Sequence, residues 1–364
     1  MLFDNPKIRQ LCLRYNDEPD FAVPEIVRLA RSPFLTGERM GIEHIFQTLP
    51  DAVQKNWRSR FISTDHVQHK SAWFEIMLYS WLGEIGVPTP EPEFLGNHPD
   101  FLLNVNGQEV VIEAKAVLIP ESVRIQKAWV HEIQWLLNQI EELSLVVNIS
   151  EVNLTSRIDA ANFLEEVMPW LQNTSRSDFQ YEDDQGNHIN LEILWRREQG
   201  GVATAGPSGS FWIDSSKLQR PLREKAHQHK AIRKSEYPYL IAIYLEDKVY
   251  SAEEIAEAWF GRETVVVDIN TATAVDQRLD MSGIHYFGRE IRHRSVSGTL
   301  VFQDYYNSNE RSRRLQVWYI QNPYATKPVD PTLFPVKGRF VVKGQDERRY
   351  QMGWERNPRE EVET

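Results

Sequence analysis

GNHPDFLLNVNGQEVVIEAKAVL, residues 96–118, is the stretch of sequence that decides the fold. Apolar residues, many of them branched or aromatic, recur at alternate positions on both sides of Asn106-Gly107, the pair preferred in two-residue type I′ turns. The pattern therefore predicts a β-hairpin. With that pair as the loop, pairing continues down the ladder until Asp100 lies directly opposite Glu113.

The two faces of this predicted hairpin differ in chemistry. Strand alternation puts Lys115 on the same face as Asp100 and Glu113. The opposite face is apolar and suited to a core: Phe101, Leu103, Val110, Ile112 and Ala114. Carboxylates that face each other with Cβ atoms about 5 Å apart repel and destabilise the pair. A divalent cation between them reverses that interaction, and a nearby lysine can bind an anionic substrate or position a water, as in a metal-dependent phosphodiesterase.

Pro99-Asp100 followed by Glu113-Ala114-Lys115 resembles the signature of the PD-(D/E)XK nuclease superfamily, which has the restriction-endonuclease-like fold. The resemblance covers residues 71–117, and both Pro-Asp and (D/E)xK also occur elsewhere in the chain. It implies an α/β fold with an αβββαβ core, in which helices flank a mixed central sheet, elaborated here by insertions.

The resemblance also implies the roles of four catalytic residues. Asp100 and Glu113 would bind Mg²⁺ or Mn²⁺, and Lys115 would act at the attacking water or the scissile phosphate. Many members carry a glutamate on the helix before the hairpin, and Glu75 in WFEIMLYSWLGEIGV matches it. Glu75 would bind the metal directly or through water.

Two helix–strand pairs compete to complete this core. The first is a helix over about 124–143 followed by the strand LSLVVNISEV, and the second is a helix over 218–234 followed by LIAIYL. LIAIYL lacks polar alternation, as a central buried strand should, so we favour the second pair. The predicted organisation then has an N-terminal helical segment at 1–70, a nuclease-like core at 71–250 with an insertion around 120–212, and a C-terminal α/β extension at 251–364.

The net charge of −11 is unusual for a protein that binds nucleic acid. Basic residues nevertheless gather in residues 217–234, with smaller islands at 289–294 and 311–314, and a local positive surface can exist on an acidic protein. The family often has a polar pair on the core helix near the metal, which Lys225 and Gln228 match. We expect three residues of this stretch to bind substrate: Lys225, Gln228 and Lys230. The alternative is an ordinary solvated basic face.

The single cysteine, Cys12, excludes an internal disulfide and a cysteine-based zinc cluster, and it fits a reducing compartment. The N-terminus shows no signal-peptide pattern, and no run of about 18 apolar residues exists to span a membrane. We therefore expect a cytoplasmic protein without a membrane partner. His66 and His69 lack a third ligand nearby and are interpreted as structural.

The leading hypothesis is a Mg²⁺-dependent nuclease that hydrolyses phosphodiester bonds in nucleic acid, with DNA favoured over RNA by the resemblance. One alternative is a catalytically inactive protein of this fold that binds nucleic acid or acts as a scaffold, which the acidic charge supports. Another is an unrelated α/β enzyme in which the carboxylate pair is a structural accident. The chain could also act as a homodimer.

Overall fold

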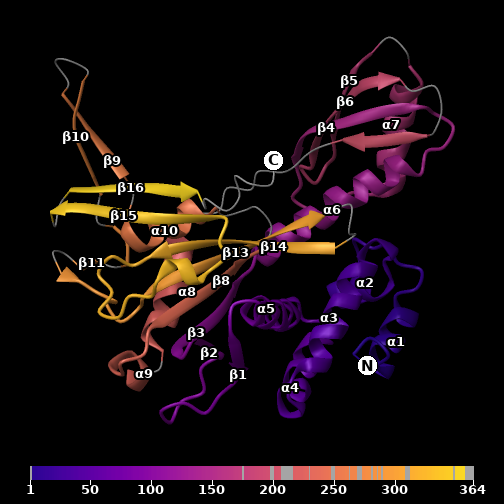
Figure 1. The fold of residues 1–364 in the computed structure, drawn as a ribbon. Coiled ribbons are helices and arrows are strands. Elements are labelled where there is room, and N and C mark those ends of the chain that lie inside the picture. The colour runs from indigo at the N-terminus through magenta and orange to yellow at the C-terminus, as the bar shows by residue number, and fades with distance from the viewer. Residues whose placement is uncertain are drawn as a thin grey trace. The chain divides into compact units, whose positions relative to one another are not determined.

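The computed structural model describes residues 2–173, 176–196, 201–205, 216–228, 230–246, 251–261, 263–268, 273–279, 282–284, 286–287, 290–307, 312–346 and 349–356. The chain divides into two compact units (Figure 1). The larger comprises Met1–Glu18, Val23–Leu118 and Ile213–Thr364, and the smaller comprises Pro19–Ala22 and Ile119–Trp212. The smaller unit spans most of the insertion expected around 120–212 together with Pro19–Ala22, whereas the rest of the expected N-terminal segment and the expected C-terminal segment lie in the same unit as the expected core.

An eight-stranded mixed sheet forms the centre of the larger unit, in the order β1-β2-β3-β8-β13-β14-β15-β16. Its strands are β1 (Val87–Pro90), β2 (Phe101–Val105), β3 (Gln108–Val117), β8 (Tyr239–Leu245), β13 (Gly298–Asn307), β14 (Ser312–Gln321), β15 (Gly338–Asp346) and β16 (Arg349–Arg356). The strands β3, β8 and β13 run parallel to one another, while β1, β2 and β3 pair antiparallel. Every residue of β8 is buried, which confirms the prediction of a central strand from its unbroken apolar run.

The hairpin β2–β3 has the predicted register. Val105 pairs with Gln108, and Phe101 pairs with Ile112. Asn106 and Gly107 have φ values of 52° and 86°, the left-handed conformation that a type I′ turn requires at both central residues. The five residues of the predicted apolar face all belong to one buried cluster. A slip of one residue would expose that face, so burial and turn chemistry fix the same register.

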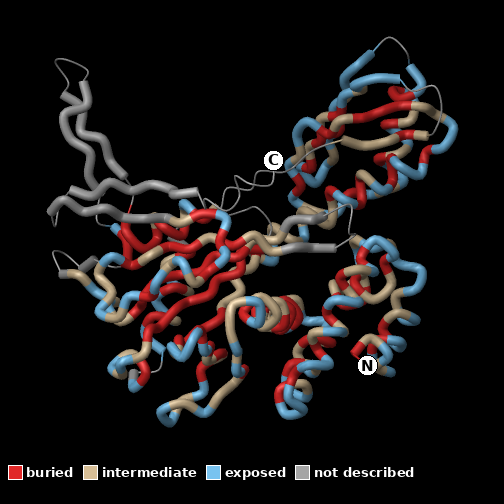
Figure 2. Tube along the Cα trace, in the orientation of Figure 1, coloured by how far each residue is buried: buried red, intermediate tan, exposed pale blue. Residues whose placement is uncertain are grey.

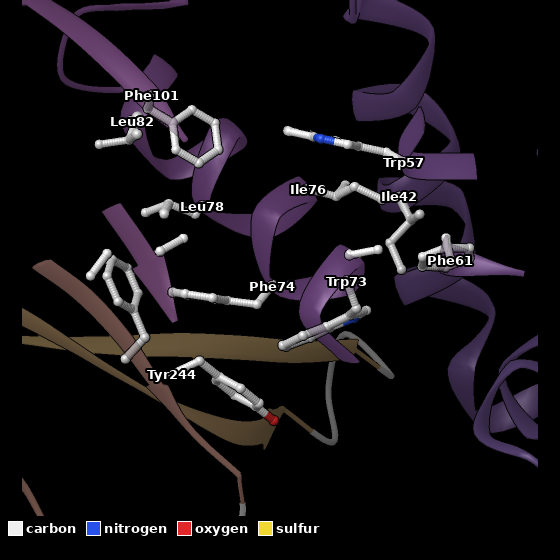
Figure 3. Packing of buried hydrophobic residues seen from close by; sticks show 14 of the residues in the cluster. Ile42, Trp57, Phe61, Trp73, Phe74, Ile76, Leu78, Leu82, Phe101 and Tyr244 are labelled. Atoms are coloured by element: carbon white, nitrogen blue, oxygen red, sulfur yellow. The ribbon is translucent and has the colours of Figure 1, made fainter. Parts of the chain in front are cut away.

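One face of the sheet is covered by the N-terminal helices. These are α1 (Pro6–Arg14), α2 (Glu25–Arg31), α3 (Thr36–Thr48), α4 (Asp51–Phe61) and α5 (His66–Gly83), with a 3₁₀ turn at Pro33–Leu35. α5 begins where the Asp65 carboxylate accepts a hydrogen bond from the Gln68 N–H, an N-cap that satisfies a helix-end donor. Its aromatic residues reach the sheet, where Phe74 stacks on Tyr244 of β8 (Figure 3).

The opposite face is covered by α8 (Ser216–His227) and α10 (Ala252–Phe260), with the short α9 (Lys230–Lys234) between them in sequence. Leu218, Leu222 and Ala226 of α8 are fully buried in a cluster with alternate residues of β8. Because successive side chains of β8 enter different clusters, the sheet separates two hydrophobic layers. Figure 2 shows the buried residues concentrated in the central strands and in α5.

The smaller unit has its own sheet and core. Its strands β4 (Leu145–Asn153), β5 (Asp178–Glu182), β6 (His188–Arg196) and β7 (Val202–Ala205) are ordered β5-β6-β4-β7. The helices α6 (Glu121–Asn138) and α7 (Ala160–Gln172) pack on this sheet through a separate buried cluster. The helix and strand after the hairpin, which competed for a place in the central sheet, therefore build this second core.

Several further details complete the fold. The segment before the hairpin contains β1, which includes Pro88 and Pro90; it is an edge strand and so tolerates proline. The helix expected over 218–234 is divided into α8 and α9. After α10, β9 (Glu263–Asp268) pairs antiparallel with β10 (Thr273–Leu279). A short pair, β11 (Tyr286–Phe287) and β12 (Glu290–Ile291), and a 3₁₀ turn at Pro331–Leu333 complete the described elements.

No helix among the described residues is long and apolar enough to cross a membrane.

Candidate active site

Asp100, the residue before β2, lies close to Glu113 of β3, and the ammonium group of Lys225 joins the two carboxylates. Lys225 Nζ is 3.0 Å from Asp100 Oδ2 and 2.7 Å from Glu113 Oε2. The Ala114 N–H donates a hydrogen bond to Asp100 Oδ2 at 2.7 Å, which holds this carboxylate against β3. The described pairing ends with Phe101 opposite Ile112, so the next residue on each side, Asp100 and Glu113, continues the register that the hairpin predicts.

The carboxylate pair is short of positive charge. The Glu113 side chain is 2% exposed. Burial first, and then the neighbouring Asp100 carboxylate, raise the pKa of Glu113 to about 8 against the opposing effect of Lys225. Burial alone would lower the pKa of Lys225, but Asp100 and Glu113 more than compensate, so the net shift is upward. The lysine therefore stays protonated, and one ammonium does not neutralise the two acids.

The position of Lys225 follows from the packing of α8. The residue next to it, Ala226, is fully buried and belongs to an i, i+4 apolar stripe with Leu222, which directs this helix face onto the sheet. The Tyr239 hydroxyl, on β8, donates a hydrogen bond to the Lys225 carbonyl at 2.7 Å. These contacts place the lysine side chain at the margin of the buried face, within reach of Glu113.

Glu75 lies near the pair but is bound to an arginine from α4. Arg60 Nη1 and Nη2 donate to Glu75 Oε1 and Oε2 at 2.7 and 2.6 Å. Burial raises the pKa of Glu75, Arg60 opposes this, and the Asp100 and Glu91 carboxylates add to the rise. Glu75 is thus within the electrostatic range of Asp100, while both of its oxygens are engaged by Arg60. The hairpin motif that suggested the site gave no indication that Arg60 belongs to it.

Glu91 is a further carboxylate near Arg60, and it supports the backbone of Asp100. Its backbone is left-handed, with φ of 48°, which is uncommon for a residue other than glycine. The Trp57 indole N–H donates to Glu91 Oε1 at 2.9 Å, and Arg60 Nη2 lies 3.7 Å from the same oxygen. The Glu91 N–H also donates to the Asp100 carbonyl at 2.9 Å, so the residue buttresses the backbone that presents Asp100.

Lys115, the lysine of the sequence motif, is engaged elsewhere. Its Nζ lies 3.8 Å from Glu224 Oε2, and Arg220 Nε binds Glu224 Oε1 at 2.9 Å. The side chains of Lys115 and Glu224 are 38% and 50% exposed. The structure thus places the lysine of the helix, rather than that of the strand, between the carboxylates.

The other two predicted substrate-binding residues have different outcomes. Gln228 is exposed in the bend after α8, and its backbone carbonyl accepts a hydrogen bond from Arg233 Nε at 3.0 Å. The side chain of Lys230, at the start of α9, lies outside the described residues. Of the three, Lys225 is the one that the described contacts bring to the carboxylate pair.

The donor set of this site fits a hard divalent cation held by two protein ligands. Among the described residues, no group of three or more His, Cys, Asp or Glu could hold a metal ion. Mg²⁺ usually keeps several waters and binds through one or two carboxylates together with substrate phosphates. Asp100 and Glu113 would supply such a pair if Lys225 left its position between them.

No protein-family model matches the chain, and searches of curated proteins and of solved structures find no match. The interpretation of the site therefore depends on its own geometry and chemistry.

Proposed function

We propose that the protein is a Mg²⁺-dependent nuclease that hydrolyses phosphodiester bonds, with DNA as the favoured substrate. The observation that carries the proposal is the carboxylate pair Asp100–Glu113 with Lys225 at 3.0 and 2.7 Å. The order of elements around it, α5-β1-β2-β3 followed after the insertion by α8-β8, supports the proposal because the restriction-endonuclease-like core has the order αβββαβ.

In this proposal Asp100 and Glu113 hold the cation. A divalent cation bound there would lower the pKa of a coordinated water and offset charge that develops on the phosphate. The burial of Glu113 keeps bulk water from screening the charges in the site, which strengthens every interaction there. Glu91 and the Ala114 N–H keep Asp100 in place.

Lys225 has two successive partners in this scheme. Without a cation, its ammonium neutralises part of the carboxylate charge. With a cation bound at the two carboxylates, the Lys225 side chain would be available to the scissile phosphate, where its positive charge would stabilise the more negative transition state. An ammonium beside carboxylates keeps its proton, so electrostatic stabilisation is its role rather than general base catalysis. Lys115, exposed and paired with Glu224, is assigned to neither task.

A second candidate function is an inactive protein of this fold that binds nucleic acid. The specific observation in its favour is that Lys225 already bridges both carboxylates, as a permanent structural ion pair would. In that case the protein would bind nucleic acid with or without a divalent cation and would not cleave it.

The test is cleavage of plasmid DNA, and of RNA of matched sequence, with Mg²⁺ and with chelator. Asp100→Asn and Glu113→Gln should abolish Mg²⁺-dependent cleavage. Glu109→Gln is the matched control. Glu109 lies on the same face of β3 as Glu113, but it pairs with Asn104 near the turn. A wild type that cleaves neither substrate, or an Asp100→Asn variant that retains full activity, would contradict the proposal.

A further inference from the structure

Two basic stretches that are far apart in the sequence meet at the C-terminal end of α8, the helix that carries Lys225. The ring of His227, at the end of α8, lies 4.8 Å from the ring of His293 between their centroids. Lys327 Nζ donates to the carbonyl of Arg233, in α9, at 3.3 Å. We call the assembled group the basic cluster: Arg223, His227, Arg233, Arg292, His293 and Lys327.

Positive charge is concentrated in the basic cluster. Burial lowers the pKa of His293 to about 4, and His227, Arg223, Arg233 and Arg292 contribute to the shift. His293 is therefore neutral at physiological pH, whereas the three arginines remain charged. Glu236 is the acid whose charge acts on Lys327, where burial lowers the lysine pKa and Glu236 opposes it. Among these described groups, cations outnumber acids, and such self-repulsion favours the binding of an anion.

The backbone of the basic cluster is constrained. His293 has a φ of 55°, a left-handed conformation that costs free energy in a residue with a side chain. The Asn322 side chain donates to the His293 carbonyl at 3.3 Å, and the Arg294 carbonyl accepts a hydrogen bond from the Thr326 N–H at 2.8 Å. These hydrogen bonds hold the loop in the conformation that brings the His293 ring to the His227 ring, although the surrounding arginines repel one another.

The Tyr239 hydroxyl lies close enough to both groups of charges that each of them shifts its pKa. Burial raises the pKa of Tyr239, Glu113 and Asp100 raise it further, and Arg233 lowers it. Tyr239 is the residue whose hydroxyl binds the Lys225 carbonyl. α8 itself carries Lys225 to the carboxylates and His227 to the basic cluster. If one phosphate of a nucleic acid strand lay at the carboxylate pair, the neighbouring phosphates of that strand would lie toward the arginines of the basic cluster.

We propose that the basic cluster binds the phosphodiester backbone of a nucleic acid strand next to the scissile bond. The inference rests on the proposed function, for which it supplies the substrate-binding surface. Guanidinium groups bind phosphate oxygens in a bidentate manner, and the neutral His293 can donate a hydrogen bond without adding charge. Recognition through phosphates is independent of base sequence, and it resolves the conflict between the net charge of −11 and an anionic substrate.

The experiment measures the affinity for a fluorescently labelled duplex by anisotropy in chelator, where cleavage does not occur, at several salt concentrations. Arg223→Gln and Arg292→Gln remove exposed cations, so folding should be retained, which melting temperatures verify. Each variant should bind about eightfold more weakly at ~0.1 M salt and flatten the salt dependence by about one unit of slope. The loss should be equal for unrelated sequences.

The matched control is Arg14→Gln, an exposed arginine of α1, a helix that packs into the hydrophobic layer on the other side of the sheet. It should bind as the wild type does. Unchanged affinity and slope in both cluster variants, or no binding by the wild type, would overturn the inference. Full displacement of the duplex by millimolar inorganic phosphate would also overturn it, because the site would then take a single phosphate.

The two proposals fail separately. Weakened binding in the cluster variants, together with a wild type that never cleaves, would support the basic cluster and contradict the nuclease. Cleavage that depends on Asp100, together with cluster variants that bind normally, would support the nuclease and contradict the basic cluster.

Discussion

Among the described residues of the larger unit, two partly buried ion clusters differ in their balance of charge. The first, which we call the anchoring cluster, ties α2 and α5 to the end of β8: Glu25, Arg28, His66, Lys70 and Glu246. Lys70 Nζ lies 3.5 Å from Glu25 and 4.0 Å from Glu246. Arg28 binds Glu25 at 2.6 Å, and His66 Nε2 is 2.8 Å from Glu246 Oε1. Two carboxylates thus meet two permanent cations.

The candidate site is not balanced in this way. Its carboxylates are Glu75, Glu91, Asp100 and Glu113, and its cations are Arg60 and Lys225. With every group ionised, four negative charges meet two positive ones, which leaves a surplus of two negative charges. The upward pKa shifts of Glu113 and Glu75 express the same deficit of positive charge.

We interpret this difference as one between a structural cluster and a candidate functional one. A buried ion cluster is stable when its charges are paired and hydrogen-bonded, and an unbalanced one costs free energy. The surplus at the candidate site equals the charge of one divalent cation, whereas the anchoring cluster needs none. Substitutions at the candidate site should therefore change the response to a divalent cation, whereas substitutions in the anchoring cluster should change stability alone.

The largest effect is expected for Asp100→Asn. Loss of one cation ligand should lower Mg²⁺-dependent cleavage by about a thousandfold, because the ion contributes several kcal/mol of transition-state stabilisation. The rise in melting temperature that millimolar Mn²⁺ produces in the wild type should vanish. Thermal denaturation with and without Mn²⁺ measures this, and Glu109→Gln should retain both responses. A metal response that survives in Asp100→Asn would place the cation elsewhere.

Glu246→Ala should have the opposite profile. The Glu246 and Lys70 side chains are 8% and 4% exposed, and removal of one partner from a buried pair costs about 3–5 kcal/mol. Chemical denaturation should show that loss, while the Mn²⁺-induced shift in melting temperature and the metal affinity stay as in the wild type. If Glu246→Ala abolished the Mn²⁺ response, the two clusters would not be independent.

Lys225→Met should separate charge from packing at the candidate site. The metal-free protein should lose about 1–3 kcal/mol, less than a fully broken buried pair because Glu113 can take up a proton. Mn²⁺ should bind more tightly, since no ammonium competes for the carboxylates, and cleavage should fall. Isothermal titration in the absence of DNA measures the affinity. Weaker Mn²⁺ binding in this variant would show that Lys225 supports the cation instead of competing with it.

The stability of the metal-free protein should depend on pH through Glu113. Its pKa is about 8 in the folded protein against a reference of 4.5. The folded state therefore binds more protons between these values, and stability is lost as pH rises through this window. The slope should approach about 1.4 kcal/mol per pH unit. Denaturation curves of the wild type and Glu113→Gln test this, and equal slopes in both would assign the pH dependence to other groups.

The smallest effect is expected for Lys115→Met. An exposed ion pair contributes about 0–1 kcal/mol, so stability and Mn²⁺ affinity should remain close to wild type, and cleavage should change by less than about fivefold. Steady-state cleavage rates of this variant beside Lys225→Met compare the two lysines directly. A larger loss of cleavage for Lys115→Met would return the strand lysine to the phosphate.

Much of the hairpin was predictable because its determinants are local. Asn106 and Gly107 accept left-handed backbone, and a period of two decides which side chains share a face. Those two rules fixed the register and hence the pairing of Asp100 with Glu113. The central position of β8 was predictable for a related reason, since an unbroken apolar run is stable only when both faces are covered.

Contacts between elements that are distant in the chain were decided by the tertiary structure. Lys115 and Lys225 are both plausible partners of Glu113 in sequence, and the docking of α8 through Leu222 and Ala226 selects Lys225. The same docking brings His227 to His293. The pairing of Glu75 with Arg60 depends on how α4 packs against α5. Local sequence determines where each side chain points on its own element, but only the packing of whole elements determines which charges meet.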